Sequence, residues 1–180
     1  ETLGSVTFIC SDKTGTLTLN QMQVDCVLAA GETRPGLQGA TGSPWHELGL
    51  AMVLCNDAVT DKDGKLTGDP TETALLDAAQ AAGFDKPEWQ ETLPRLAEIP
   101  FDSDRARMST LHREGEAVLM LVKGAPESVL SLCVDQLAAS GTVAIDQAAL
   151  QDEAERLAAQ GLRVLAFALK RLPAVPDALD

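Results

Sequence analysis

One stretch of the chain, residues 11–18 (SDKTGTLT), places a carboxylate beside a lysine, a glycine and several hydroxyl side chains. It directly follows the apolar run of residues 6–10 (VTFIC), whose length predicts a strand buried on both faces of a parallel sheet. An aspartate just past the carboxyl end of such a strand stands where α/β sheets place their ligands. The glycine and threonines after it offer N–H groups and hydroxyls that can hold a phosphoryl group. Asp12 could then be a nucleophile that forms an acyl phosphate with the help of Mg²⁺. An Asp-initiated turn followed by a polar loop explains the same spacing equally well.

Four further segments place charged or aromatic side chains at the ends of predicted elements. Residues 68–75 (GDPTETAL) start a helix with acidic side chains in its first turn, which is complete as structure without any ligand. Residues 100–109 (PFDSDRARMS) contain Phe101, whose ring could pack in the core or stack on a base. In residues 123–127 (KGAPE) a Lys–Gly turn after an apolar strand lets the backbone approach a ligand and places a cation beside it. Residues 161–168 (GLRVLAFA) hold an arginine ahead of an apolar strand, where it could equally face solvent.

The string DKTGTLT that begins at Asp12 matches the phosphorylation motif of the P-type ATPases residue for residue, and it continues into LNQM as in type II, calcium-pump-like members. The resemblance spans residues 6–172, with the other four segments in the family order. It implies that Asp12 accepts the γ-phosphoryl group of ATP and binds Mg²⁺, to which Thr14 contributes its backbone carbonyl. The resemblance also implies that the chain is the ATP-binding domain of a cation-transporting pump. Phosphorylation of Asp12 would drive the transport.

The same resemblance assigns the adenine end of a nucleotide site. Glu72 is expected beside the adenine amino group, and Phe101 is expected to stack its ring on the base. Lys123 is expected to line the adenine pocket, with Gly124 leaving room for the ring.

At the phosphate end, the resemblance implies that Arg163 reaches the ATP phosphates. The sequence departs from the calcium pumps nearby, because Ser103 and Ala106 stand where those pumps usually carry arginine and lysine. We expect Arg107 to take over part of the phosphate attraction.

Two other functions are compatible with parts of the pattern. A haloacid-dehalogenase-type phosphatase carries a second aspartate two residues after its nucleophile as general acid and base, but Thr14 occupies that position and transfers protons poorly. A phosphoryl group on Asp12 should therefore persist long enough to drive a conformational cycle. The other alternative is a nucleotide-sensing module that is not part of a pump. The uninterrupted DKTGTLT motif argues against this alternative.

The elements that must position these residues follow from hydrophobic periodicity and turn signals. Strand character is found in residues 24–30, 95–101, 106–112, 117–122, 142–145 and 163–169. Helical patterns cover residues 45–55, 71–82, 126–133 and 146–159. Asp69 and Asp146 are predicted N-caps, and Ser43 before Pro44 gives the same signal for the first helix.

Hairpin-linked strands with separate helices predict an α+β fold, an antiparallel β-sheet flanked by helices. The resemblance divides the chain into the start of a phosphorylation domain in residues 1–20, a nucleotide-binding domain in residues 21–172 and a linker back to the phosphorylation domain in residues 173–180. The strand in the first part is interpreted as the first strand of a Rossmann-like, haloacid-dehalogenase-type domain. Because the TGDGxND motif that supplies Mg²⁺ ligands in the family is absent, the isolated fragment is expected to bind nucleotide without turnover.

The composition and charge of the chain limit which classes of partner are expected. A formal net charge of −13 repels nucleic acid and anionic membranes, so no nucleic-acid partner is expected. The four widely spaced cysteines predict buried thiols in a reducing compartment. No apolar run approaches the ~18 residues of a membrane span. The resemblance to the P-type ATPases implies a cytoplasmic domain, monomeric as a fragment, of an integral protein of a bacterial inner or plasma membrane. Its implied partners are ATP and, in the same polypeptide, the remaining phosphorylation domain, the actuator domain and the transmembrane helices.

Overall fold

The computed structural model describes residues 21–176 of the chain. The strand predicted at residues 6–10, the nucleophile Asp12 and the metal ligand Thr14 lie outside the described residues. The predictions about a phosphorylation domain and its Mg²⁺ ligands therefore stay predictions.

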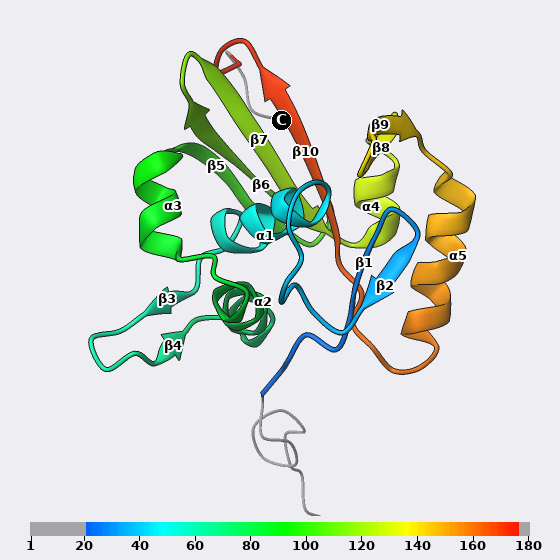
Figure 1. The fold of residues 1–180 in the computed structure, drawn as a ribbon, viewed down its shortest axis with the longest axis horizontal. Helices are drawn as coiled ribbons and strands as arrows, with labels where there is room; N and C mark the ends of the chain where they lie inside the picture. The colour runs from blue at the N-terminus through cyan, green and yellow to red at the C-terminus, as the bar shows by residue number, and fades with distance from the viewer. Residues whose placement is uncertain (1–20, 177–180) are drawn as a thin grey trace, which may run out of the picture.

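A four-stranded antiparallel sheet with the strand order β10–β7–β6–β5 forms the centre of the fold (Figure 1). Its strands are β5 (Arg95–Asp102), β6 (Arg107–Glu114), β7 (Ala117–Gly124) and β10 (Ala166–Leu172). The first three form a meander, and Glu114 pairs with Ala117 across the tight turn at Gly115, whose φ is 62°. The antiparallel α+β class predicted from the sequence is confirmed.

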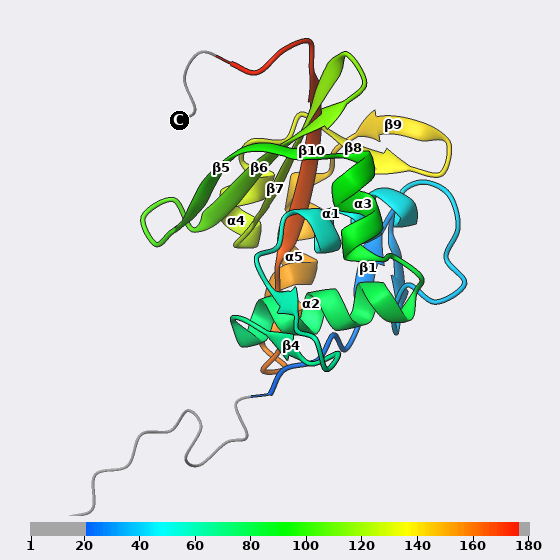
Figure 2. The ribbon, with the colours of Figure 1, turned by 90° about the vertical axis from the view of Figure 1, so that its left-hand side faces the viewer.

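Helices lie on both sides of β10 in Figure 1. They are α1 (Trp45–Leu54), α2 (Pro70–Ala81), α3 (Lys86–Thr92), α4 (Pro126–Leu130) and α5 (Gln147–Ala158). Helix α1 packs on β7 and β10, and the turned view shows α2 and α3 beside it (Figure 2). The main core lies at this interface, where Met52 and Leu54 of α1 meet Leu119 and Leu121 of β7. Helix α4 also contacts β7 and β10, and α5 packs against α4.

Three small hairpins complete the described part of the chain. They are formed by β1 (Val27–Ala29) with β2 (Glu32–Arg34), β3 (Val59–Thr60) with β4 (Leu66–Thr67), and β8 (Asp135–Ala138) with β9 (Gly141–Ala144). The sequence predicted only one strand in the first and third of these hairpins and none in the second. Strands of two to four residues are too short for a period-2 pattern to develop, which explains the omissions.

The helix starts agree with the predicted caps in two of three cases. The Asp69 carboxylate accepts the Thr71 N–H at 2.8 Å, and the Asp146 carboxylate accepts the Ala149 N–H at 3.0 Å. Ser43 does not cap α1, because the helix begins one residue later, with Pro44 at the cap position and no side-chain hydrogen bond there.

The cysteine prediction is correct only in part. Among the described residues Cys55 is buried, whereas Cys26 and Cys133 are partly exposed, and all three are free thiols. Burial raises the pKa of the Cys55 thiol, which keeps it protonated and unreactive. Within residues 21–176, no helix combines the length and hydropathy that crossing a membrane requires.

Candidate nucleotide-binding site

The predicted nucleotide residues gather at one end of the central sheet. The register pairs Asp102 of β5 with Arg107 of β6, Arg107 with Gly124 of β7, and Gly124 with Ala166 of β10. This row of paired residues crosses the whole sheet at one end. Phe101 and Lys123 each lie next to a residue of the row, so segments far apart in the sequence deliver their side chains to the same end.

The centre of this region is an ion pair between Glu72 of α2 and Lys123 of β7. Glu72 Oε1 lies 2.6 Å from Lys123 Nζ, and the two side chains are only 16% and 9% exposed. The second carboxylate oxygen, Oε2, accepts the backbone N–H of Asp57 at 3.0 Å. Two buried charges that are paired and hydrogen-bonded in this way hold each other in a fixed geometry. The two predicted adenine-pocket residues therefore form one unit.

A third predicted residue reaches the same helix. Arg163 Nη1 donates to the Thr71 hydroxyl at 3.0 Å, one residue before Glu72 in the first turn of α2. The prediction that Arg163 begins a strand is wrong, because β10 starts only at Ala166 and Arg163 lies in the loop after α5. Its hydrogen bond to Thr71 places its guanidinium at the first turn of α2, the turn that also carries Glu72.

Phe101 lies in an irregular part of β5. Its pairing with β6 shifts register between Ile99 and Asp102, and the Phe101 side chain is 65% exposed. A core role for this ring, the alternative left open by the sequence, is thus wrong. An exposed ring at the site end of the sheet is free to stack on a ligand.

The described structure gives Arg107 a contact that the sequence did not predict. Its Nη1 donates to the Ser128 hydroxyl of α4 at 3.0 Å and to the Arg105 carbonyl at 3.3 Å. These bonds tie Arg107 to α4, and its expected attraction for phosphate stays a prediction.

Gly124 has a structural reason to be glycine apart from any ligand. A Cβ at this position would lie 2.4 Å from the Ala106 carbonyl oxygen and 2.7 Å from the Arg107 Cα. Both contacts are with the neighbouring backbone, which cannot move out of the way easily. The expected space for an adenine ring stays a prediction.

Ala106, one of the two positions that depart from the calcium pumps, adopts a left-handed conformation with φ at 51°. A side chain beyond hydrogen disfavours this region, so we expect Ala106→Gly to stabilise the domain by about 0.5–1 kcal/mol. Urea unfolding of both proteins measures the difference. Ala78→Gly within α2 is the matched control, and it should destabilise by about 1 kcal/mol. Equal destabilisation by both substitutions would contradict the prediction.

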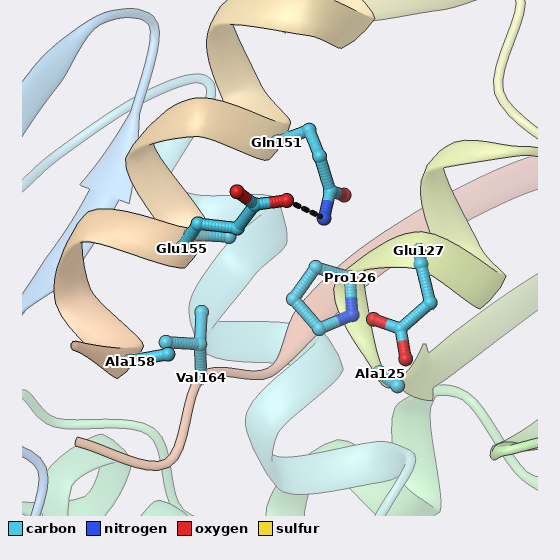
Figure 3. Close-up of a pocket in the computed structure, with 8 residues that line it drawn as sticks. Ala125, Pro126, Glu127, Gln151, Glu155, Ala158 and Val164 are labelled. Atoms are coloured by element: carbon cyan, nitrogen blue, oxygen red, sulfur yellow. Dashed lines mark hydrogen bonds between the residues drawn. The ribbon is translucent and has the colours of Figure 1, made fainter. Parts of the chain in front are cut away.

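A shallow cavity of about 260 Å³ lies next to the site, between α4 and α5 (Figure 3). Pro126 and Glu127 form one wall, and Gln151 and Glu155, joined by a hydrogen bond, stand on the other. None of the predicted nucleotide residues lines it. Its two carboxylates disfavour an anionic ligand, so we do not assign the triphosphate to it.

Sequence reasoning missed Asn56, a fully buried residue just after α1 that is hydrogen-bonded to α2. The available signal was a polar Asn–Asp pair that ends the apolar run of residues 50–55. Within residues 21–176 no group of three or more His, Cys, Asp or Glu side chains could hold a metal ion. The predicted ligands Asp12 and Thr14 are not among those residues.

Comparisons with known proteins agree with this arrangement. The family model described as P-type ATPase, cytoplasmic domain N, matches residues 44–178. The whole chain is 40% identical to part of a cation-transporting ATPase of Synechocystis sp., of which it covers 23%. A calcium-transporting ATPase of Listeria monocytogenes is 42% identical over 97% of this chain and 20% of that protein. The chain thus spans about a quarter or less of the curated relatives it matches. It belongs to the P-type ATPases, as their cytoplasmic domain N.

Proposed function

We propose that this domain binds ATP at the site end of the sheet, chiefly through the adenine base. In the parent protein it delivers the γ-phosphoryl group to Asp12, and the resulting acyl phosphate drives cation transport. The observation that carries the proposal is the buried Glu72–Lys123 pair at the same end of the sheet as the exposed Phe101 ring. The family match favours this function over a haloacid-dehalogenase-type phosphatase.

The charges support binding through the base rather than the phosphates. Glu72 neutralises Lys123, and Arg107 is engaged with Ser128 and a backbone carbonyl. Within residues 21–176, Arg105 and Arg163 form no ion pair and are the side chains left to attract phosphate. The net charge of −13 opposes a triphosphate overall. We therefore expect ADP and AMP to bind nearly as well as ATP.

Phe101→Ala tests the proposal with little risk of unfolding. Stacking on an aromatic ring contributes about 1–3 kcal/mol per base, so the substitution should weaken AMP binding by about fivefold or more. Because the ring is exposed, the unfolding midpoint should stay nearly unchanged. Isothermal titration with AMP, ADP and ATP gives the affinities.

The control is Val175→Ala, which removes an exposed apolar side chain just after β10, whose last residue, Leu172, pairs with Val118 at the opposite end of the sheet. It should leave the affinities as they are. Unchanged AMP binding by Phe101→Ala would argue against the proposal. So would a large preference for ATP over AMP in the unsubstituted 180-residue chain.

In the parent protein we place this domain on the cytoplasmic side of a membrane, beside the rest of the phosphorylation domain, the actuator domain and the transmembrane helices. Mg²⁺ would be held by Asp12 and Thr14 together with groups from outside this chain.

A further inference from the structure

We infer that Asn56 is a positioning residue of the nucleotide site, which fixes Glu72 and, through Glu72, the ammonium group of Lys123. The inference rests on the proposed function, since it concerns the geometry of the same site. Asn56 follows α1 and is fully buried, yet it is neither charged nor predicted to touch the nucleotide.

The amide of Asn56 uses its hydrogen-bonding groups on three parts of the fold. Nδ2 donates to the Met52 carbonyl in α1 at 3.0 Å and to the Glu72 carbonyl in α2 at 2.9 Å. Oδ1 accepts the backbone N–H of Ala58 at 2.8 Å. Exchanging the amide oxygen and nitrogen would set an acceptor against two carbonyls and a donor against an N–H group, so a single orientation satisfies all three partners.

These bonds hold Glu72 from two directions. The first is the direct bond from Asn56 to the Glu72 main-chain carbonyl. The second runs through the loop, because the Asn56–Ala58 bond shapes the turn in which the Asp57 N–H points at Glu72 Oε2. With its backbone and one oxygen fixed, Glu72 presents its other oxygen, Oε1, to Lys123.

The same loop is held from its other side by two cationic side chains. Lys86 Nζ donates to the Asn56 carbonyl at 2.7 Å and to the Ala58 carbonyl at 2.6 Å. Arg95 Nη2 also donates to the Asn56 carbonyl, at 3.0 Å. These bonds fix the loop backbone without reaching α2. The Asn56 side chain and the Asp57 N–H thus connect this fixed loop to Glu72.

The test compares Asn56→Ser and Asn56→Ala with a matched control in the 180-residue chain. Serine keeps an oxygen that can accept the Ala58 N–H but cannot reach the two carbonyls, so the turn should form without its link to Glu72. The control is Thr110→Val on β6, which breaks an equally buried hydrogen bond, to His112, and takes part in none of the bonds of Asn56 or Glu72. AMP is the probe in titration calorimetry, and circular dichroism confirms that each variant is folded.

Both Asn56 variants should bind AMP about tenfold more weakly, while Thr110→Val should bind it like the parent chain even though it also lowers stability. In proton–nitrogen spectra of the lysine ammonium groups, the Lys123 signal should shift or disappear in Asn56→Ser and stay in place in Thr110→Val. A role in stability alone would not move that signal. In a Glu72→Gln background, Asn56→Ser should add little further loss of binding, because both changes act through the same pair.

The outcomes separate the two proposals. If the parent chain binds no adenine nucleotide, the proposed function fails and this inference fails with it. If the parent chain binds AMP but Asn56→Ser binds it equally well, or if its effects add fully to those of Glu72→Gln, the inference alone is overturned.

Discussion

Glu72→Ala is expected to lower the free energy of unfolding by about 3–5 kcal/mol, because it leaves the Lys123 ammonium group buried without its carboxylate. The Asp57 N–H loses its acceptor in the same variant. Nucleotide binding should fall below detection, since the site loses the Glu72 carboxylate that is expected to accept the adenine amino group. It also loses the contact that orients the Lys123 ammonium group. Urea unfolding followed by circular dichroism measures the stability, and AMP titration measures the binding.

Two comparisons make this result specific. Glu114→Ala removes a surface ion pair with Arg171, whose side chains are 31% and 57% exposed, and should barely move the unfolding midpoint. The double variant Glu72→Leu/Lys123→Met replaces both buried charges by apolar groups, so it should recover much of the stability without recovering AMP binding. If Glu72→Ala costs no more than Glu114→Ala, the pair contributes little and the prediction is wrong.

The second large effect is a loss of stability in mild acid, caused by His112. The pKa of this imidazole is lowered from 6.5 to about 4, chiefly by burial; the bond to the Leu93 carbonyl opposes this shift, and the nearby Arg95 adds to it. That carbonyl can only accept, so Nδ1 carries the proton and Nε2 accepts the Thr110 hydroxyl proton. The folded protein therefore holds His112 neutral in a range where the unfolded chain is already protonated.

The direction of the pH dependence follows from this difference. Above pH 6.5 His112 is neutral in both the folded and the unfolded protein, so protonation of His112 does not reduce stability there. Between pH 6.5 and 4 only the unfolded state gains the proton, so stability should fall by up to roughly 3 kcal/mol. Urea midpoints at closely spaced pH values measure the slope. His112→Gln removes the titrating group and should flatten this part of the curve; an unchanged slope would show that other groups cause it.

The sequence predicted the regular elements best where local signals and tertiary packing agree. Strands β5, β6 and β7 combine apolar patterns with a Gly115 turn, and Asp69 and Asp146 do cap their helices. Helix α3 was missed although Asp85 accepts the Glu88 N–H at its start. Seven residues give too few turns for a helical period to stand out, and tertiary packing of the helix supplies the rest.

The site was harder to predict because its contacts are long-range. Glu72 and Lys123 are 51 residues apart, and no spacing rule pairs a helix start with a strand end at that separation. Their assignment came from the family resemblance, which named them without saying that they bind each other. The exposure of Phe101 depends on a register shift between two strands, which no local pattern encodes. Asn56 was missed for a similar reason, since its partner Glu72 lies 16 residues further along the chain, on α2.

The irregular pairing of β5 also matters for how the molecule behaves at high concentration. Within the described residues, β5 is an outermost strand of the central sheet, a position whose free backbone groups can template pairing with a strand of another molecule. Pro100 has no N–H to offer, and the register shift between Ile99 and Asp102 interrupts the regular ladder. The same break that exposes the Phe101 ring therefore makes this edge a poor template for aggregation.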